Sequence, residues 1–249
     1  MKEYENKVVI VVGSTSGIGK AMAEKFAENG ATVIITGRRA EKGKEVAAQL
    51  TKKGYHADFA QMDVMDISSA EKTIDAIVAK HGRLDAFLYN AGIAGYGELD
   101  SQVWDNIMTT NAKAAYFLGR KAFSYLKETK GALLFTSSMS GIKASCNISQ
   151  NAGIAYGMSK AAVNHMVSML ALQYAASGVR VNGIAPGLTK TDILNGVSDE
   201  LLHALEQEIP LHFAAEPSDM ANVAYFLCSE SSRFITGEVI NVNGGAAIN

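Results

Sequence analysis

The sequence predicts a doubly wound α/β fold, in which one parallel sheet carries helices on both faces. Three observations lead to this prediction. Short apolar runs, rich in β-branched residues, alternate with helical patterns along the whole chain. Several of these runs are hydrophobic at almost every position, as expected for parallel strands that are buried on both faces. The 249 residues contain no repeat, linker or low-complexity tract, which favours a single domain over residues 1–249.

The predicted elements follow one another in regular alternation. Strands are predicted at residues 8–12, 32–36, 56–62, 84–89, 132–136, 179–184 and 239–242. Helices are predicted at 19–29, 41–53, 68–81, 101–127, 156–176 and 219–227. Four of these helices are followed by a glycine that ends them, at Gly30, Gly54, Gly82 and Gly178. Right-handed crossovers then place helices on both faces of the sheet. The segment 188–213 departs from this alternation and is interpreted as an excursion from the core.

Composition and charge exclude several classes of function. With a net charge of -2, the chain lacks the excess of basic residues that binding to nucleic acid or to an anionic membrane surface would require. Cys146, Cys228 and the five scattered histidines show no metal-ligand spacing, so we expect no metal site and a reducing compartment. The apolar run at 8–12 is too short for a signal or membrane segment. We therefore expect a cytoplasmic protein whose partners are small molecules and other subunits.

A glycine-rich turn, Gly13-Ser14-Thr15-Ser16-Gly17-Ile18-Gly19, joins the first predicted strand to the first helix. Its glycines allow the backbone to approach a ligand closely, and the helix N-terminus offers free N–H groups to a pyrophosphate. The second strand ends at Arg38-Arg39, where NAD-binding units usually place a carboxylate for the ribose 2′-hydroxyl. Two guanidinium groups suit a 2′-phosphate instead, which predicts NADP(H). Without the turn, two solvated arginines at the start of a helix would be the better interpretation.

The later strands end in residues that could line the same site. Asp63-Val64 could meet an adenine ring, although an ordinary turn at the end of a strand is nearly as good an interpretation. The small residues of Asn90-Ala91-Gly92 would let the backbone approach a ligand at the carboxyl edge of the sheet. Pro186-Gly187 lead to Thr191, which could reach a nicotinamide amide.

Tyr156 and Lys160 are four residues apart and therefore share one face of a predicted helix. Tyrosine, with a reference pKa of about 10, is a poor base near neutrality, and a nearby ammonium favours its phenolate. The serine-rich segment 137–141 follows the fifth strand, where a hydroxyl could bond a substrate carbonyl. Asn111 interrupts the long helix and needs a polar partner. The order of these features along one chain predicts a proton-transfer site rather than a chance pair.

With these residues the chain resembles the short-chain dehydrogenase/reductase family in its short, single-domain form with a Rossmann-type sheet. The resemblance extends from Val8 to about Gly245 and includes the closing motifs at 235–237 and 242–245. It implies that Tyr156 is the general acid/base and that Ser138, three residues before Gly141, orients the carbonyl oxygen. It also implies that Lys160 holds the nicotinamide ribose and lowers the pKa of Tyr156. Asn111 would keep a helix irregularity and bind a water that links Lys160 to solvent.

For the cofactor, the resemblance implies binding by residues 13–19, by Arg38 in the family's NADP position, and by Arg39, Asp63, Val64, Asn90, Ala91, Gly92, Tyr156, Lys160, Pro186, Gly187, Thr189 and Thr191. The chain departs from the family pattern in two places. Tyr89 stands before Asn90 where another asparagine is usual. Ser138 and Tyr156 are 18 residues apart, about five more than usual, and the extra residues within 145–155 are expected to form a loop at the mouth of the site.

The leading hypothesis is an NADP(H)-dependent oxidoreductase that interconverts a ketone and a secondary alcohol by hydride transfer. One alternative is a 3-oxoacyl-(acyl-carrier-protein) reductase, but Ala132 and Ser177 stand where such enzymes have basic residues that dock the acidic carrier, although Lys127 and Lys130 could compensate. If the apolar segment 188–213 is a lid, it would suit a hydroxysteroid or another lipophilic carbonyl as the substrate. An equal interpretation is that its apolar residues simply pack on the core or on another subunit. A sugar or polyol also stays open as the substrate. A non-catalytic NADP-binding sensor and a scaffold subunit are the alternatives from other classes. The resemblance also implies a homo-oligomer, a tetramer, with contacts in the stretch 234–249.

Overall fold

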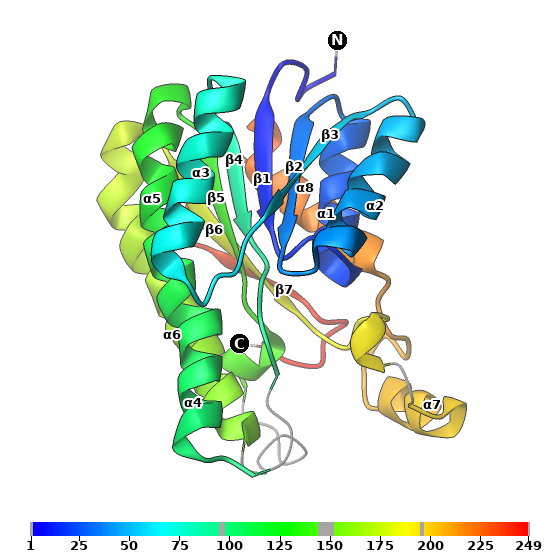
Figure 1. Cartoon of the computed structure of the whole chain (residues 1–249). Helices are drawn as coiled ribbons and strands as arrows, with labels where there is room; N and C mark the ends of the chain where they lie inside the picture. The colour runs from blue at the N-terminus through cyan, green and yellow to red at the C-terminus, as the bar shows by residue number, and fades with distance from the viewer. Residues whose placement is uncertain (1, 95–97, 144–151, 195–196, 249) are drawn as a thin grey trace.

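The computed structural model of the chain describes residues 2–94, 98–143, 152–194 and 197–248 (Figure 1). Seven parallel strands form one sheet in the order β3-β2-β1-β4-β5-β6-β7. The winding reverses between β1 and β4, and the predicted doubly wound fold is confirmed. The strands are β1 (Val8–Val12), β2 (Thr32–Gly37), β3 (His56–Gln61), β4 (Ala86–Tyr89), β5 (Ala132–Thr136), β6 (Arg180–Pro186) and β7 (Val239–Val242).

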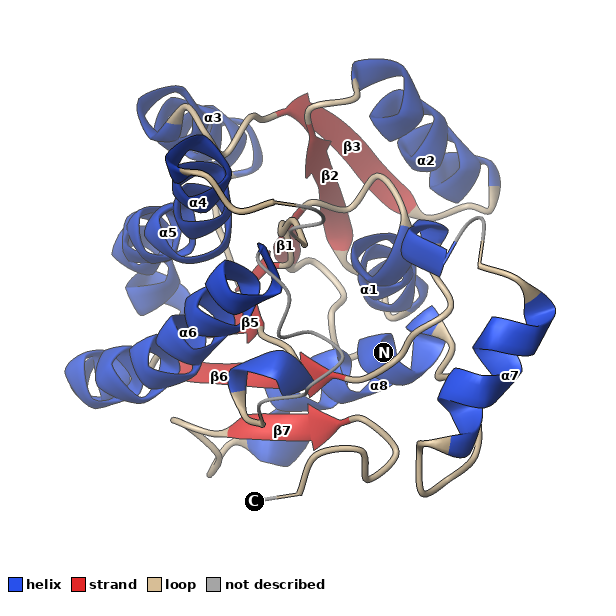
Figure 2. Cartoon of the chain, turned by 90° about the horizontal axis from the view of Figure 1, so that it is seen from below, coloured by secondary structure: helices blue, strands red, loops and turns tan. Residues whose placement is uncertain are grey.

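The central strands are apolar throughout because helices cover both faces of the sheet (Figure 2). In β1, Val9 and Val11 pack on one side, while Val8, Ile10 and Val12 pack on the other. The first side is covered by α1 (Gly17–Glu28), α2 (Ala40–Lys52) and α8 (Pro217–Cys228), and the second by α3 (Ile67–His81), α5 (Ala114–Thr129) and α6 (Ala152–Tyr174). Among the described helices, none combines the length and apolar character of a membrane span.

Two predicted helices differ from the observed ones. The predicted helix at 101–127 is divided into α4 (Ser101–Met108), a π-helical turn (Thr109–Lys113) and α5. The helix predicted at 156–176 begins earlier, at Ala152, and ends in a 3-10 turn (Ala175–Ser177). The expectation of a loop over 145–155 is therefore wrong for residues 152–155, because Ala152 and Ala155 are buried against Ile107 of α4. Residues 145–151 lie outside the described part of the chain.

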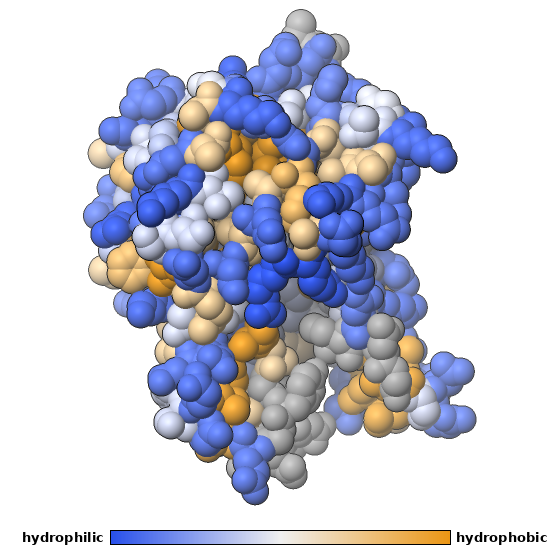
Figure 3. Space-filling view, viewed as in Figure 1, coloured by the Kyte–Doolittle hydropathy of each residue, from blue (hydrophilic) through white to orange (hydrophobic). Residues whose placement is uncertain are grey.

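The segment 188–213 leaves the sheet after β6 and returns through a parallel bridge between Thr189 and Ala215. It contains a 3-10 turn (Asp192–Leu194) and α7 (Asp199–Gln207), whose N-terminus is capped by the Ser198 hydroxyl. α7 stands apart from the sheet at the lower right of Figure 1, and hydrophobic residues are visible over it in Figure 3. The exposed large apolar side chains of this segment are Leu201, Leu211 and Phe213.

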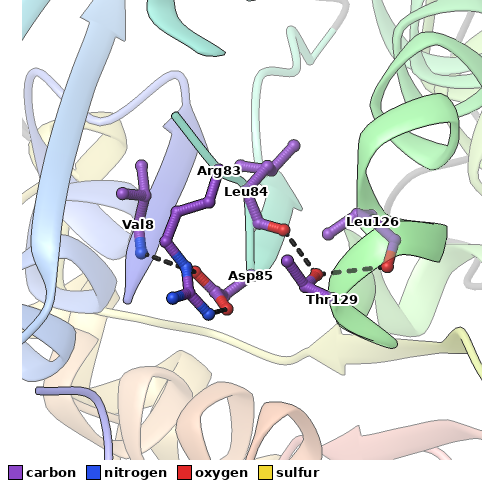
Figure 4. A network of polar contacts seen from close by, with 6 residues as sticks. All are labelled: Val8, Arg83, Leu84, Asp85, Leu126 and Thr129. Carbon is purple, nitrogen blue, oxygen red and sulfur yellow. Dashed lines mark hydrogen bonds and ion pairs between the residues drawn. The ribbon is translucent and has the colours of Figure 1, made fainter. Parts of the chain in front are cut away.

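A buried carboxylate organises the amino edge of the sheet (Figure 4). Asp85 accepts hydrogen bonds from the Val8 backbone N–H at 2.8 Å and from two guanidinium nitrogens of Arg83 at 2.7 and 2.8 Å. The Thr129 hydroxyl donates to the Leu84 carbonyl at 2.6 Å and so ties the end of α5 to the same edge. Charge-assisted hydrogen bonds of this kind are stronger than neutral ones. They hold the start of β1 and β4 in place, while the carboxyl ends of the same strands carry the polar residues described next.

Candidate active site

A cleft with a volume of about 750 Å³ opens along the carboxyl edge of the sheet. This edge, at the point where the winding reverses, is where open α/β sheets bind ligands. Most of the predicted site residues lie in its walls: Gly13, Thr15, Ser16, Gly17, Ile18, Arg38, Arg39, Asp63, Val64, Asn90, Ala91, Gly92, Ser138, Tyr156, Lys160, Pro186, Gly187, Thr189 and Thr191. Three others, Ser14, Gly19 and Asn111, lie behind the walls and support them. The fold therefore brings together in one cleft predicted site residues that are spread over most of the sequence.

The glycine-rich turn is packed too tightly for side chains at two of its glycines. Gly13 has a φ of +76°, and a Cβ there would lie 2.8 Å from the backbone of Ala91. A Cβ on Gly19 would lie 2.2 Å from the Gly13 carbonyl oxygen. The Asn90 side-chain amide donates to that same carbonyl oxygen at 3.0 Å. The turn after β1 is thus clamped against the end of β4, with its backbone facing the cleft.

Ser14 supports this turn from inside the protein. Its hydroxyl donates to the Val11 carbonyl oxygen at 2.7 Å and accepts from the Thr36 N–H at 3.0 Å. Its own N–H donates to the Thr36 carbonyl oxygen at 3.0 Å. Because the residue is fully buried and both groups are engaged, Ser14 joins β1 to β2 rather than presenting a side chain to the cleft.

Two arginines form a basic corner where β2 ends. The Arg39 guanidinium donates from Nη2 to the hydroxyls of Thr15 and Ser16, at 2.8 and 2.9 Å. Arg38 is also exposed in the cleft wall, and its carbonyl oxygen accepts from the Gln61 side chain at 3.1 Å. The guanidinium of Arg39 therefore lies over the glycine-rich turn, and the sequence alone did not distinguish Arg39 from Arg38 in this respect.

Opposite this corner, the chain after β6 closes the cleft. The Thr189 hydroxyl donates to the Gly187 carbonyl oxygen at 3.0 Å, so the turn is braced internally. A Cβ on Gly17 would lie 3.3 Å from the Thr191 side chain, which shows how closely the two walls approach. Asp63 and Val64 lie where the sequence predicts contact with the adenine ring. Asp63 is exposed and accepts a hydrogen bond from the Met65 N–H at 3.0 Å, while Val64 is buried.

An ion pair that the sequence did not predict joins α2 to Asp192 in the wall of the cleft. Lys42 of α2 lies 3.3 Å from the Asp192 carboxylate, although the two are 150 residues apart. Both side chains are about half exposed. Other lining residues that sequence reasoning missed are mostly apolar or part of the strand ends, and carry no local motif: Val12, Gly37, Met62, Met65, Ile93, Ala94, Asn106, Thr110 and Thr136.

Lys160 places a buried cation beneath Tyr156. The lysine is 3% exposed, and its Nζ lies 5.7 Å from the centre of the Tyr156 ring. Nζ donates to the Thr136 carbonyl oxygen at 2.9 Å, at the end of β5. Burial lowers the pKa of Lys160 to about 8, because desolvation disfavours the charged form. The ammonium is still the main form at neutral pH, so a positive charge stands beside the phenol.

Ser138 follows β5 and faces the same cleft as Tyr156. It precedes a 3-10 turn (Met139–Gly141), and its hydroxyl accepts from the Ser140 N–H at 3.2 Å. The residue is buried. This contact orients the hydroxyl oxygen locally, while the hydroxyl proton can point to a ligand oxygen. The predicted serine, tyrosine and lysine therefore line one cleft in the observed fold.

Asn111 lies in the π-helical turn, where the sequence predicted an interruption. Its Oδ1 accepts from the Ile93 N–H at 2.9 Å, and its Nδ2 donates to the Ile93 carbonyl oxygen at 3.0 Å and to the Ser159 hydroxyl at 2.9 Å. The Ser159 hydroxyl in turn donates to the Tyr156 carbonyl oxygen at 2.7 Å. Asn111 thus connects the chain after β4 to the turn of α6 that carries Tyr156 and Lys160. In the described residues no cluster of three acidic, histidine or cysteine side chains could hold a metal ion.

Comparison with known proteins extends this description. The profile of the family described as "Enoyl-(Acyl carrier protein) reductase" matches residues 12–247. The chain is 34% identical to a 3-oxoacyl-(acyl-carrier-protein) reductase of Aquifex aeolicus, covering 98% of both chains. It is also 34% identical to a meso-2,3-butanediol dehydrogenase of Serratia marcescens, covering 98% of this chain and 95% of the relative. A short-chain type dehydrogenase/reductase structure from Mycobacterium ulcerans superposes with a TM-score of 0.90 at 30% identity, covering 98% and 90% of the two chains.

Proposed function

Since the chain belongs to the short-chain dehydrogenase/reductase family and is an oxidoreductase of alcohol and ketone groups, we propose that it uses NADP(H) and that Tyr156 is its general acid/base. The observation that carries this proposal is the buried ammonium of Lys160 beside the Tyr156 ring, in a cleft that Ser138 also lines. A buried charge is costly unless it is paired or hydrogen-bonded, and a Tyr156 phenolate would supply the opposite charge beside Lys160. A stabilised phenolate is the form of Tyr156 that this geometry suits.

The cleft has the features that a dinucleotide requires. Gly13 and Gly19 leave no space for side chains, so the backbone of the turn can face a pyrophosphate. Arg38 and Arg39 provide two cations at the end of β2, where a ribose 2′-phosphate would lie. The adenosine and nicotinamide ends of the cofactor would be lined by Asp63-Val64, Asn90-Ala91-Gly92 and the stretch 186–191. When bound, the cofactor supplies the hydride donor or acceptor.

The protein's own residues move and stabilise the proton. In the reductive direction the Ser138 hydroxyl donates a hydrogen bond to the substrate carbonyl oxygen, and the Tyr156 hydroxyl gives its proton to the same oxygen. The Lys160 ammonium stabilises the phenolate that remains, since the buried Nζ lies 5.7 Å from the centre of the partly buried Tyr156 ring. Asn111 keeps the Tyr156 turn of α6 in place through Ser159. In the oxidative direction the same steps run in reverse.

The proposed chemistry is tested by following NADPH absorbance with a panel of ketones, for the wild type and for Tyr156→Phe. We expect Tyr156→Phe to lower kcat by more than about 100-fold, the lower range for a positioned acid/base. NADPH binding, followed by fluorescence, should be retained in the variant. If the wild type binds NADPH but reduces no carbonyl, the non-catalytic sensor becomes the better explanation.

The cofactor preference is tested separately. Hydrogen bonds to charged groups contribute about 1.5–3 kcal/mol, so Arg38→Ala and Arg39→Ala should each weaken NADPH binding by roughly 10- to 100-fold. NADH lacks the 2′-phosphate, and its binding should change much less. Exposed Lys53, at the end of α2, offers a matched control for the loss of one surface cation. Equal or better use of NADH by the wild type would overturn the assignment to NADP(H).

For the substrate we propose a partly apolar ketone or secondary alcohol, with residues 1–249 forming one domain and segment 188–213 acting as a lid. The lining side chains Ile93, Leu188 and Leu194 are apolar, and α7 exposes one further leucine, Leu201. The similarity to a carrier-protein reductase makes 3-oxoacyl groups the second candidate. Against it, Ala132 is buried and Ser177 is neutral where basic docking residues are expected. Parallel assays with an acyl-carrier thioester and with free lipophilic ketones separate the two candidates.

We also propose that the chain assembles as a homo-oligomer, a tetramer. The exposed side of α6 is apolar at Ile154, Met158, Met169 and Leu172, the last of which is 80% exposed. Near the C-terminus Phe234 is fully exposed. Contiguous apolar surface on a folded chain is typical of a contact with another protein. Light scattering on the purified protein measures the mass directly, and a monomer would contradict the proposal.

A further inference from the structure

The segment that carries Ser138 lies directly on the backbone of α6. A Cβ on Gly141 would be 2.6 Å from the carbonyl carbon of Lys160 and 2.8 Å from the Ala161 nitrogen. A Cβ on Gly157 would be 3.1 Å from the Ser140 carbonyl oxygen. No side chain separates the two segments at these points. A small slide of residues 137–141 along the helix would therefore change where Ser138 stands relative to the tyrosine and lysine of α6.

Two polar side chains hold this segment at one place on the helix. Asn164, one turn beyond Lys160, donates from Nδ2 to the Gly141 carbonyl oxygen at 3.0 Å. With its amino group used in this way, its Oδ1 is left to accept the hydrogen bond from the Ser137 hydroxyl. The same hydroxyl also lies 3.1 Å from the Lys160 carbonyl oxygen. One asparagine thus ties both ends of the serine-bearing segment to the helix.

We propose that Ser137 and Asn164 are positioning residues that hold Ser138 in register with Tyr156 and Lys160. The proposal rests on the proposed function, because it assigns these residues to the same reaction. Ser137 is 2% exposed and its hydroxyl is held by α6, so its contribution comes through its neighbour in sequence. Tight packing at the two glycines keeps the segment against α6, and the asparagine sets its position along the helix axis.

The expected effect follows from the geometry that catalysis requires. Displacing a catalytic group by about 1 Å can lower a rate by roughly 100-fold. We therefore expect Asn164→Ala to lower kcat by about 10- to 100-fold, with the dissociation constant of NADPH unchanged within about twofold. A purely structural asparagine would instead lower Tm and leave kcat unchanged at temperatures well below unfolding.

A double-mutant cycle separates these possibilities, because residues that act as a unit show non-additive effects. The cycle compares wild type, Asn164→Ala, Ser138→Ala and the double variant, with kcat measured on the best ketone of the panel. We expect Asn164→Ala to reduce kcat by less than about threefold once Ser138 is absent. Ser137→Ala should behave in the same way, and it removes only one hydroxyl, so it keeps the test available if Asn164→Ala fails to fold.

Asn182 offers a matched control in β6. It is buried, donates to the Ile235 carbonyl oxygen at 2.9 Å and accepts from the Glu238 N–H at 3.1 Å, so it also makes two hydrogen bonds. Asn182→Ala should lower Tm by a similar amount and leave kcat within about twofold of the wild type. Equal losses of kcat from Asn164→Ala with and without Ser138, or a loss of Tm alone, would overturn the positioning role. A wild type that reduces no ketone would overturn the proposed function, and this inference with it.

Discussion

Replacing Lys160 by methionine should make the protein more stable while it removes activity. Burial lowers the pKa of this lysine from its ordinary value of 10.5 to about 8. The folded state therefore binds the proton less tightly than the unfolded state does. The resulting cost is fully present below pH 8, and it disappears as the pH rises towards 10.5. Methionine is similar in length and apolar, so it fills the same space without this cost.

The magnitude follows from the same two pKa values. A tenfold change in a protonation constant is worth about 1.4 kcal/mol, so the buried ammonium costs up to about 3 kcal/mol at pH 7. Lys160→Met also removes the hydrogen bond that the ammonium donates to the Thr136 carbonyl oxygen, and a hydrogen bond of a charged group contributes about 1.5–3 kcal/mol. The net gain is up to about 1.5 kcal/mol, or roughly 3–6 °C in Tm for a chain of this size.

The assay is unfolding of the cofactor-free protein by heat and by urea, at pH 7 and again near pH 10. Lys160→Met should exceed the wild type in Tm at pH 7, and the difference should shrink near pH 10. The exposed Lys53→Met controls for the loss of a lysine that has no burial cost. A variant that is less stable than the wild type at pH 7, or an advantage that is the same at both pH values, would refute the reasoning.

Three further predictions concern the walls of the cleft. Gly19→Ala places a Cβ 2.2 Å from the Gly13 carbonyl oxygen, so NADPH affinity in a fluorescence titration should fall at least about 10-fold; wild-type affinity would contradict this. Lys42→Ala removes the exposed ion pair to Asp192, so it should change unfolding free energy by less than about 1 kcal/mol. Stopped-flow fluorescence should nevertheless show NADPH leaving severalfold faster, whereas an equal rate would mean that the pair does not restrain the wall of the cleft. Asn111→Leu leaves the part-buried backbone N–H and carbonyl of Ile93 without their partner and should cost more than about 2 kcal/mol in urea unfolding; an unchanged midpoint would argue against its bridging role.

The strands were predictable because burial on both faces leaves a continuous apolar signature. β1, β5 and β7 begin and end where the sequence predicted. Glycines at the ends of helices were also recognisable, since Gly30, Gly54, Gly82 and Gly178 all have a positive φ. The first turn of α6 was missed, because the sequence prediction started this helix at Tyr156, whereas the helix begins at Ala152 and packs Ala152 and Ala155 against Ile107 of α4.

By itself, the sequence determined the alternating α/β order, the glycine-rich turn, and the i,i+4 pair of Tyr156 and Lys160. These features are local, because a strand, a turn or one helix face depends on residues within a few positions of each other. Only the tertiary structure decided which arginine reaches the turn, that Lys42 meets Asp192, and that Asn164 holds the segment carrying Ser138. Such contacts join separate elements, and their partners depend on how the helices and strands pack, which no local pattern encodes.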